Sequence, residues 1–149
     1  MLANNAVKQA IVVAENILGS EKKYRGFVSN SVSKTGDSII GSVGITSEKA
    51  KEYFKVVVGK FKGLSKYKSC EGKELIVKLI CNEKGVIVGC QVIGYEDVSG
   101  VLNMVSSYIK NEQSVHDLVE VDTCYNPCVA SMHNPLIEAA KVVVKKLGR

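Results

Sequence analysis

Two apolar segments flanking a tight polar turn constrain this fold more than any other feature of the chain. They are Glu74-Leu-Ile-Val-Lys-Leu-Ile-Cys81 and Gly85-Val-Ile-Val-Gly-Cys-Gln-Val-Ile93, and the turn is Asn82-Glu-Lys-Gly85. Branched apolar residues on both sides of a short turn that ends in glycine predict an antiparallel hairpin. The fold must therefore contain an antiparallel sheet whose centre is buried on at least one face.

The five cysteines argue against a disulfide framework. They are odd in number, and a chain of 149 residues can bury a core without covalent staples. A hairpin turn centred between residues 83 and 84 would pair Cys81 with Val86 and Cys90 with Val77, which keeps these two thiols from facing each other. We therefore expect Cys81 and Cys90 to be free, buried side chains, and a reducing, cytoplasmic setting.

The other expected elements place strands before helices, which predicts an α+β fold. We expect an antiparallel sheet of about four strands with helices on one side, preceded by a separate helix. Apolar periodicity and capping residues predict further strands at 38–45 and 55–61, helices at 3–18, 47–54, 97–109, 135–147 and from Ser114, and a Ser-, Lys- and Gly-rich linker at 20–37.

Composition excludes several classes of function. No apolar run approaches the ~20 residues of a membrane helix, so no membrane partner is expected. The net charge of +5 comes from eighteen lysines and only two arginines, which we interpret as solubilising rather than as a nucleic-acid footprint. A basic, aromatic-containing stretch at 60–68 fits a solvated strand end better than an anion site. The chain also lacks glycine-rich dinucleotide, phosphate-loop and serine-hydrolase motifs, so it is not equipped to be an enzyme by itself.

Reactive side chains concentrate in residues 122–140, which follow no regular period until Asn134-Pro135 opens a helix. Cys124, Cys128 and His133, with His116 upstream, could supply metal ligands, but their spacing is not that of a zinc finger, and no metal site is expected. A second hypothesis is covalent catalysis, with a cysteine as nucleophile, His133 as base and Glu138 as the group that orients the histidine. An exposed helix turn would explain His133 and Glu138 equally well.

The order of motifs along the chain resembles the FAD-dependent pyridine nucleotide-disulfide oxidoreductases. Leu2–Gly19 resembles the last helix of their flavin domain, and Gly41-Ser-Val-Gly-Ile-Thr-Ser-Glu-Lys-Ala50 and Gly85-Val-Ile-Val-Gly-Cys-Gln-Val-Ile-Gly94 resemble motifs of their C-terminal interface domain. The resemblance implies that residues 1–22 end a truncated FAD-binding domain and that residues 23–149 form the dimerisation domain. It also implies that Leu2, Ala3 and Asn4 lie near the cofactor.

Residues 125–140 are most similar to the branch that contains coenzyme A disulfide reductases and NADH oxidases. Tyr125-Asn-Pro127 matches the branch's Tyr-x-Pro-Pro stretch, with Cys128 in place of the second proline, and Asn134 replaces an aspartate. In this branch the resemblance implies a homodimer in which Tyr125 reaches the redox cysteine and flavin of the other subunit. Tyr67 is the position that corresponds to a second tyrosine of coenzyme A disulfide reductases.

The glutathione reductase branch implies a different pair of site residues. Its His-Pro-x-x-x-Glu motif places an acid/base histidine towards the partner's cysteines, and His133 and Glu138 keep that five-residue offset without the adjacent proline. The resemblance to this branch is the weaker of the two.

The leading hypothesis is therefore a dimerisation domain that supplies residues to a partner's redox-cysteine and flavin site. FAD and NAD(P)H would be bound by the full-length, homodimeric enzyme and not by this fragment, which alone should be inactive. A helix that begins almost at Met1 suggests that further sequence precedes it. The alternatives are a stand-alone dimeric binding module without catalysis and a small metal protein.

Overall fold

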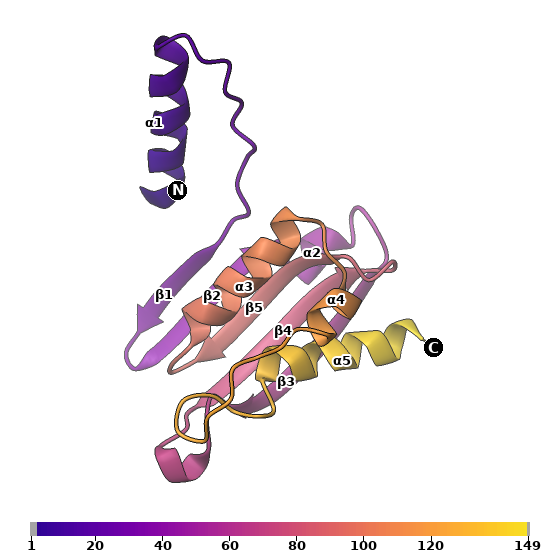
Figure 1. Cartoon of the computed structure of the whole chain (residues 1–149). Helices are drawn as coiled ribbons and strands as arrows, with labels where there is room; N and C mark the ends of the chain where they lie inside the picture. The colour runs from indigo at the N-terminus through magenta and orange to yellow at the C-terminus, as the bar shows by residue number, and fades with distance from the viewer. Residues whose placement is uncertain (1–2, 149) are drawn as a thin grey trace.

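The computed structural model describes residues 3–148 and contains a five-stranded antiparallel sheet (Figure 1). The strand order is β1-β2-β5-β4-β3, so the predicted hairpin lies at the centre and β1 and β3 form the edges. The strands are β1 (Ser31–Thr35), β2 (Ser38–Gly44), β3 (Val56–Leu64), β4 (Glu74–Asn82) and β5 (Ile87–Gly94). The α+β class and the antiparallel sheet are confirmed, with one strand, β1, inside the expected linker.

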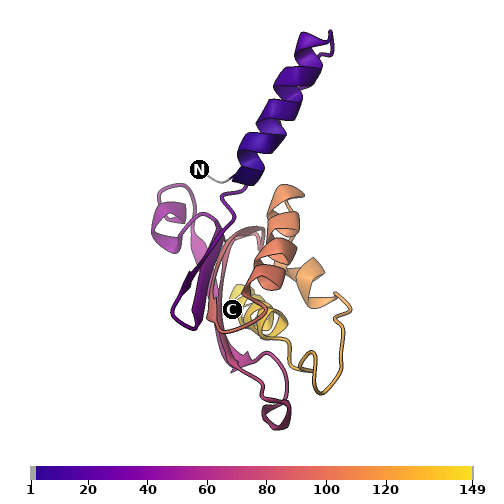
Figure 2. The ribbon, with the colours of Figure 1, turned by 90° about the vertical axis from the view of Figure 1, so that its left-hand side faces the viewer.

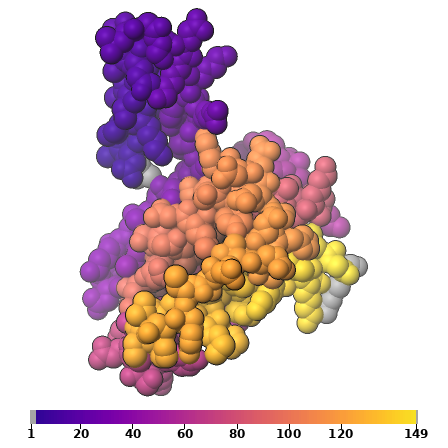
Figure 3. All heavy atoms as spheres, in the orientation of Figure 1, coloured from indigo at the N-terminus to yellow at the C-terminus, as the bar shows by residue number. Residues whose placement is uncertain are grey.

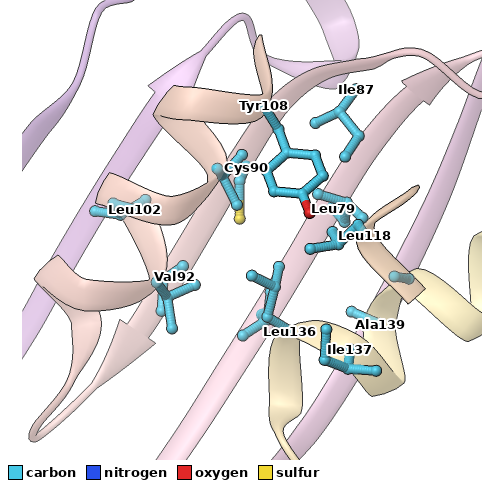
Figure 4. Close-up of a cluster of buried hydrophobic side chains, with 14 of the residues drawn as sticks. Leu79, Ile87, Cys90, Val92, Leu102, Tyr108, Leu118, Leu136, Ile137 and Ala139 are labelled. Atoms are coloured by element: carbon cyan, nitrogen blue, oxygen red, sulfur yellow. The ribbon is translucent and has the colours of Figure 1, made fainter. Parts of the chain in front are cut away.

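The core lies between the sheet and three helices that cover one of its faces. These are α3 (Val98–Lys110), α4 (Val115–Val119) and α5 (Pro135–Leu147). Figure 4 shows side chains from both layers meeting, among them Leu79 and Val92 from the sheet and Leu102 and Leu136 from the helices, all fully buried. Alternation along β4 and β5 sends every second side chain into this layer, which is the pattern of a sheet covered by helices on one side.

A short helix, α2 (Ser47–Ala50), lies against the opposite face (Figure 2). Thr46 caps it by accepting a hydrogen bond from the Lys49 amide. Lys78, which points away from the helix-covered core, donates from Nζ to Ser47 Oγ at 2.8 Å. Most of this face carries no other element among the described residues.

The central hairpin has a different register from the predicted one. Cys90 lies opposite Leu79 and Cys81 opposite Ile87, with an irregularity between Ile80 and Cys81. The prediction was wrong because it assumed a symmetric two-residue turn, whereas Asn82 pairs with Val86 across three residues. The Asn82 side chain accepts the Val86 amide at 2.9 Å, and Gly85 supplies the left-handed backbone (φ +81°) that such a turn requires.

Both hairpin thiols are free and buried, as predicted. Burial raises the pKa of each thiol, Cys81 and Cys90, to about 12.

The first helix, α1 (Ala3–Ile17), stands apart from the sheet domain (Figure 3). None of its described residues is buried, although Val7, Ile11 and Ile17 form an apolar stripe along it. The chain after it folds back, because the Lys22 amide donates to the Asn16 side chain at 2.8 Å. Across residues 3–148, no helix combines the length and apolar character needed to cross a membrane.

Candidate functional site

Two loops at one end of the sheet lie side by side and carry most of the candidate residues. Residues 65–73 connect β3 to β4 and contain the short 3-10 helix η1 (Lys68–Cys70), and residues 124–134 lead into α5. The Ser131 amide donates to the Ser65 carbonyl at 2.9 Å, and the Tyr67 amide donates to the Pro127 carbonyl at 3.1 Å. We call residues 65–73 and 124–134 the paired loops; they meet at the lower edge of Figure 1.

The paired loops bring Tyr67 and Tyr125 together. A side-chain hydrogen bond with Tyr67 is the main reason that the pKa of Tyr125 lies above the ordinary tyrosine value. A raised pKa keeps this phenol protonated, so it stays a hydrogen-bond donor. Tyr67 is 40% exposed and Tyr125 is 54% exposed, which leaves both rings accessible to another molecule.

The same loops are joined by a disulfide between Cys70 and Cys128, whose Cα atoms lie 4.9 Å apart. The expectation that no disulfide forms was therefore wrong for this pair. The two cysteines are 58 positions apart in the sequence, and only the tertiary packing of the two loops brings them into reach. Cys124 lies on the same loop as Cys128 but is free and exposed.

His133 and Glu138 form a second pair at the start of α5. His133 Nδ1 lies 3.6 Å from a Glu138 carboxylate oxygen, and Lys141 Nζ lies 2.9 Å from the same oxygen. The hydrogen bond from Lys141 is the largest cause of a lowered pKa at Glu138, and His133 contributes to the same direction. Asn134 caps the helix by accepting the Leu136 amide at 2.9 Å, which fixes the loop relative to α5.

Glu96 anchors the base of the first paired loop, and sequence reasoning missed it. It follows β5, and its carboxylate accepts a hydrogen bond from the Ser65 hydroxyl and lies 3.5 Å from Lys66 Nζ. The Ser65 hydrogen bond is the main cause of the lowered pKa of Glu96. No motif marks this glutamate in the sequence, because its partners lie about thirty residues earlier in the chain.

The expected cofactor-binding residues lie far from the paired loops. Leu2 falls outside the described residues, whereas Ala3 and Asn4 form the exposed first turn of α1. They line an open cleft of about 660 Å³, together with Asn103 from α3 and residues 26–28 and 30–32. Within the described part of the chain, no three histidine, cysteine or acidic side chains gather in a way that could hold a metal ion.

The sequence pattern of the family described as "Pyridine nucleotide-disulphide oxidoreductase, dimerisation domain" matches residues 34–136, more than half of the chain. The chain belongs to this family. The match covers all strands except the first residues of β1, both paired loops, and the first two residues of α5. The recognition of a dimerisation domain is confirmed.

Among known proteins, this dimerisation domain is 38% identical over 145 residues to an NADH oxidase from Methanocaldococcus jannaschii, covering 96% of the chain and 32% of that relative. It is 29% identical to an NAD(P)H sulfur oxidoreductase (CoA-dependent) from Pyrococcus furiosus, covering 95% of the chain and 33% of the relative. The structure of the water-forming NADH oxidase from Lactobacillus brevis, bound to NADH, is similar at a TM-score of 0.91 and 27% identity, over 99% of this chain and 33% of that one. The chain thus spans about a third of the length of these relatives.

Proposed function

We propose that this dimerisation domain pairs with a second copy of itself and presents the paired loops to a redox site on the partner subunit. The whole enzyme would be an FAD- and NAD(P)H-dependent disulfide reductase or NADH oxidase of the cytoplasm. Residues 1–22 would belong to the end of its flavin domain. The observation that carries the proposal is that Tyr67, Tyr125 and His133 lie on the exposed paired loops of a domain from this family, with Glu138 beside His133 in the first turn of α5.

The two side-chain pairs suit such a role differently. The phenol of Tyr125 is protonated at neutral pH, and Tyr67 raises its pKa further, so Tyr125 would donate a hydrogen bond to a thiolate or an oxygen atom at the partner's site. His133, held by the Glu138 carboxylate, is the candidate for moving a proton. We favour the Tyr67–Tyr125 pair over the His133–Glu138 pair, because the relatives with similar sequences are NADH oxidases and sulfur oxidoreductases.

The described residues do not form a flavin site by themselves. Ala3 and Asn4 offer small, exposed side chains at the start of α1, but the described chain has no glycine-rich phosphate-binding turn beside them. We therefore propose that Ala3 and Asn4 contact only the edge of the flavin.

Self-association tests the first half of the proposal. The face opposite α3–α5 exposes a cross-strand row in which Ile40 and Ile76 both lie opposite Ile93. Ile40 and Ile93 are 46% and 47% exposed, so the row is an apolar surface that a second copy can cover. We expect Ile93→Lys to weaken a dimer measured by analytical ultracentrifugation.

Val32→Lys is the matched control for this experiment. Val32 is 49% exposed, similar to Ile93. It lies opposite Gly41, and a Cβ atom on Gly41 would point at Leu102 of α3, so the Val32 side chain is on the helix-covered side of the sheet, away from the isoleucine row. A protein that stays monomeric at micromolar concentration would contradict the dimer.

Substitution of Tyr125 tests the second half. In the intact enzyme, Tyr125→Phe should lower turnover while leaving folding unchanged, since the ring is half exposed and loses only its hydroxyl. A dimer that forms normally and an enzyme whose kinetics do not change would instead favour a binding module without catalysis.

A further inference from the structure

The paired loops repeat one pattern of side chains. Tyr67-Lys-Ser-Cys70 and Tyr125-Asn-Pro-Cys128 each place a tyrosine three residues before a cysteine. The disulfide joins the two cysteines, and Tyr67 is the main cause of the raised pKa of Tyr125, so the tyrosines lie near each other beside the covalent link between the loops. The only bond here that a thiol can break is therefore adjacent to the candidate tyrosine pair.

The disulfide is accessible and lies outside the core. Cys128 is exposed and Cys70 is half-buried, whereas the core of the sheet domain consists of other side chains. Disulfides on exposed loops are the ones that small thiols reach, in contrast to bonds enclosed by packed side chains. The loops also keep the backbone hydrogen bonds from Tyr67 to Pro127 and from Ser131 to Ser65, which do not depend on the cysteines.

We infer that Cys70 and Cys128 form a thiol–disulfide exchange site for small thiols and disulfides, separate from the redox cysteine expected in the flavin domain. The inference goes beyond the proposed function, because it concerns two sulfur atoms of this chain and holds whether or not Tyr125 serves a partner. The opening and closing of the bond would control how firmly the loop of Tyr125 is held against that of Tyr67.

The exchange proceeds in two balanced steps. A small thiolate attacks Cys128 Sγ, forming a mixed disulfide with Cys128 and expelling Cys70 as a thiolate, which takes up a proton. A second small thiolate attacks the sulfur of the bound small molecule, releases it as a small disulfide and leaves Cys128 as a thiolate that is also protonated. Two small thiols are oxidised to one disulfide while the protein disulfide is reduced, and a small disulfide drives the reverse reaction.

Glutathione titration of the folded chain tests the inference. The background variant is Cys124→Ser, which removes the exposed free thiol. The protein is equilibrated with reduced or oxidised glutathione, alkylated with iodoacetamide and weighed by mass spectrometry, while circular dichroism follows the fold. We expect a shift of two alkyl groups between the oxidised and reduced conditions with an unchanged spectrum. A bond that opens only after denaturant is added, or whose opening unfolds the sheet domain, would overturn the inference.

Single-cysteine variants identify the attacked sulfur. In the Cys124→Ser background, Cys70→Ser should trap one glutathione on Cys128, and Cys128→Ser should trap glutathione on Cys70 roughly tenfold more slowly, because Cys70 is less accessible. Absence of an adduct on Cys128 would count against the exchange site. The titration above uses both native cysteines, so it decides the matter even where a variant fails to fold.

Discussion

Gly59→Ala should destabilise the domain by displacing the helix that follows the second paired loop. Gly59 lies in β3 directly beneath α5, where a Cβ atom would overlap the Ala139 carbonyl oxygen and lie 2.7 Å from Val143 Cγ2. Carbon atoms in good contact are about 3.5–4.0 Å apart, so α5 would have to move away by about 1 Å. It cannot do so freely, because Ala139 and Val143 are fully buried and Lys146 Nζ donates to the Val58 carbonyl at 2.7 Å.

Overpacking of this kind costs roughly 1–3 kcal/mol, and the backbone overlap places Gly59→Ala near the upper end of that range. With a urea slope of about 2 kcal/mol per molar for a domain of this size, the midpoint of unfolding should fall by about 1.5 M. Urea unfolding followed by circular dichroism measures both quantities. The substitution should also loosen the His133–Glu138 pair, because Glu138 precedes the displaced residue in α5.

Gly148→Ala is the matched control at the end of the same helix. Its added Cβ would have only the Val144 carbonyl oxygen nearby, at 3.8 Å, which is an ordinary contact. The control should change stability by less than about 0.5 kcal/mol. Equal effects of the two substitutions would refute the reasoning. They would show that the close packing of β3 against α5 does not depend on the absence of a side chain at Gly59.

Three further predictions concern the site and its surroundings. Tyr67→Phe should lower the pKa of Tyr125 towards 10.0, because it removes the main cause of the raised value; nuclear magnetic resonance of labelled tyrosine measures it, and an unchanged titration would contradict the pairing. Glu138→Gln should lower the thermal stability at neutral pH, and the difference should close as the pH falls below 4.5, because a carboxyl with a lowered pKa stabilises the fold only while ionised; parallel melting curves would refute this. In the oxidised native chain, iodoacetamide should label Cys124 alone, because the two other free thiols are buried with a pKa of about 12; two or more labels by mass spectrometry would disprove it.

Most of the fold could be predicted because short stretches of sequence are enough to identify most of its strands and helices. Alternating apolar residues mark β4 and β5, and capping residues such as Ser114 mark the helix starts. The strand β1 could not be predicted in the same way, since Ser31-Val-Ser-Lys-Thr35 is exposed along its whole length and pairs with β2 only through its backbone. Its polar composition is typical of an edge strand and also of a linker.

The site was predictable only where a residue type carried its own chemistry or matched a family motif. Tyr67 and Tyr125 were named on that basis, and the structure brings them together. The Cys70–Cys128 bond and the role of Glu96 could not be found, because each depends on loops that approach from distant parts of the chain. The spacing of residues along the sequence does not show which distant loops lie side by side in the fold.

The exposed strand β1 also has a consequence for aggregation. It covers the outer edge of β2, where Ile39 and Ile40 lie in a strand with more apolar character. A polar edge that carries Lys34 is a poor template for pairing with strands of other chains. A shortened chain that starts after residue 36 would lack β1 and leave β2 as the open edge. Such a chain could aggregate through β2 while its core stays folded, so the five residues of β1 protect the domain without contributing to its core.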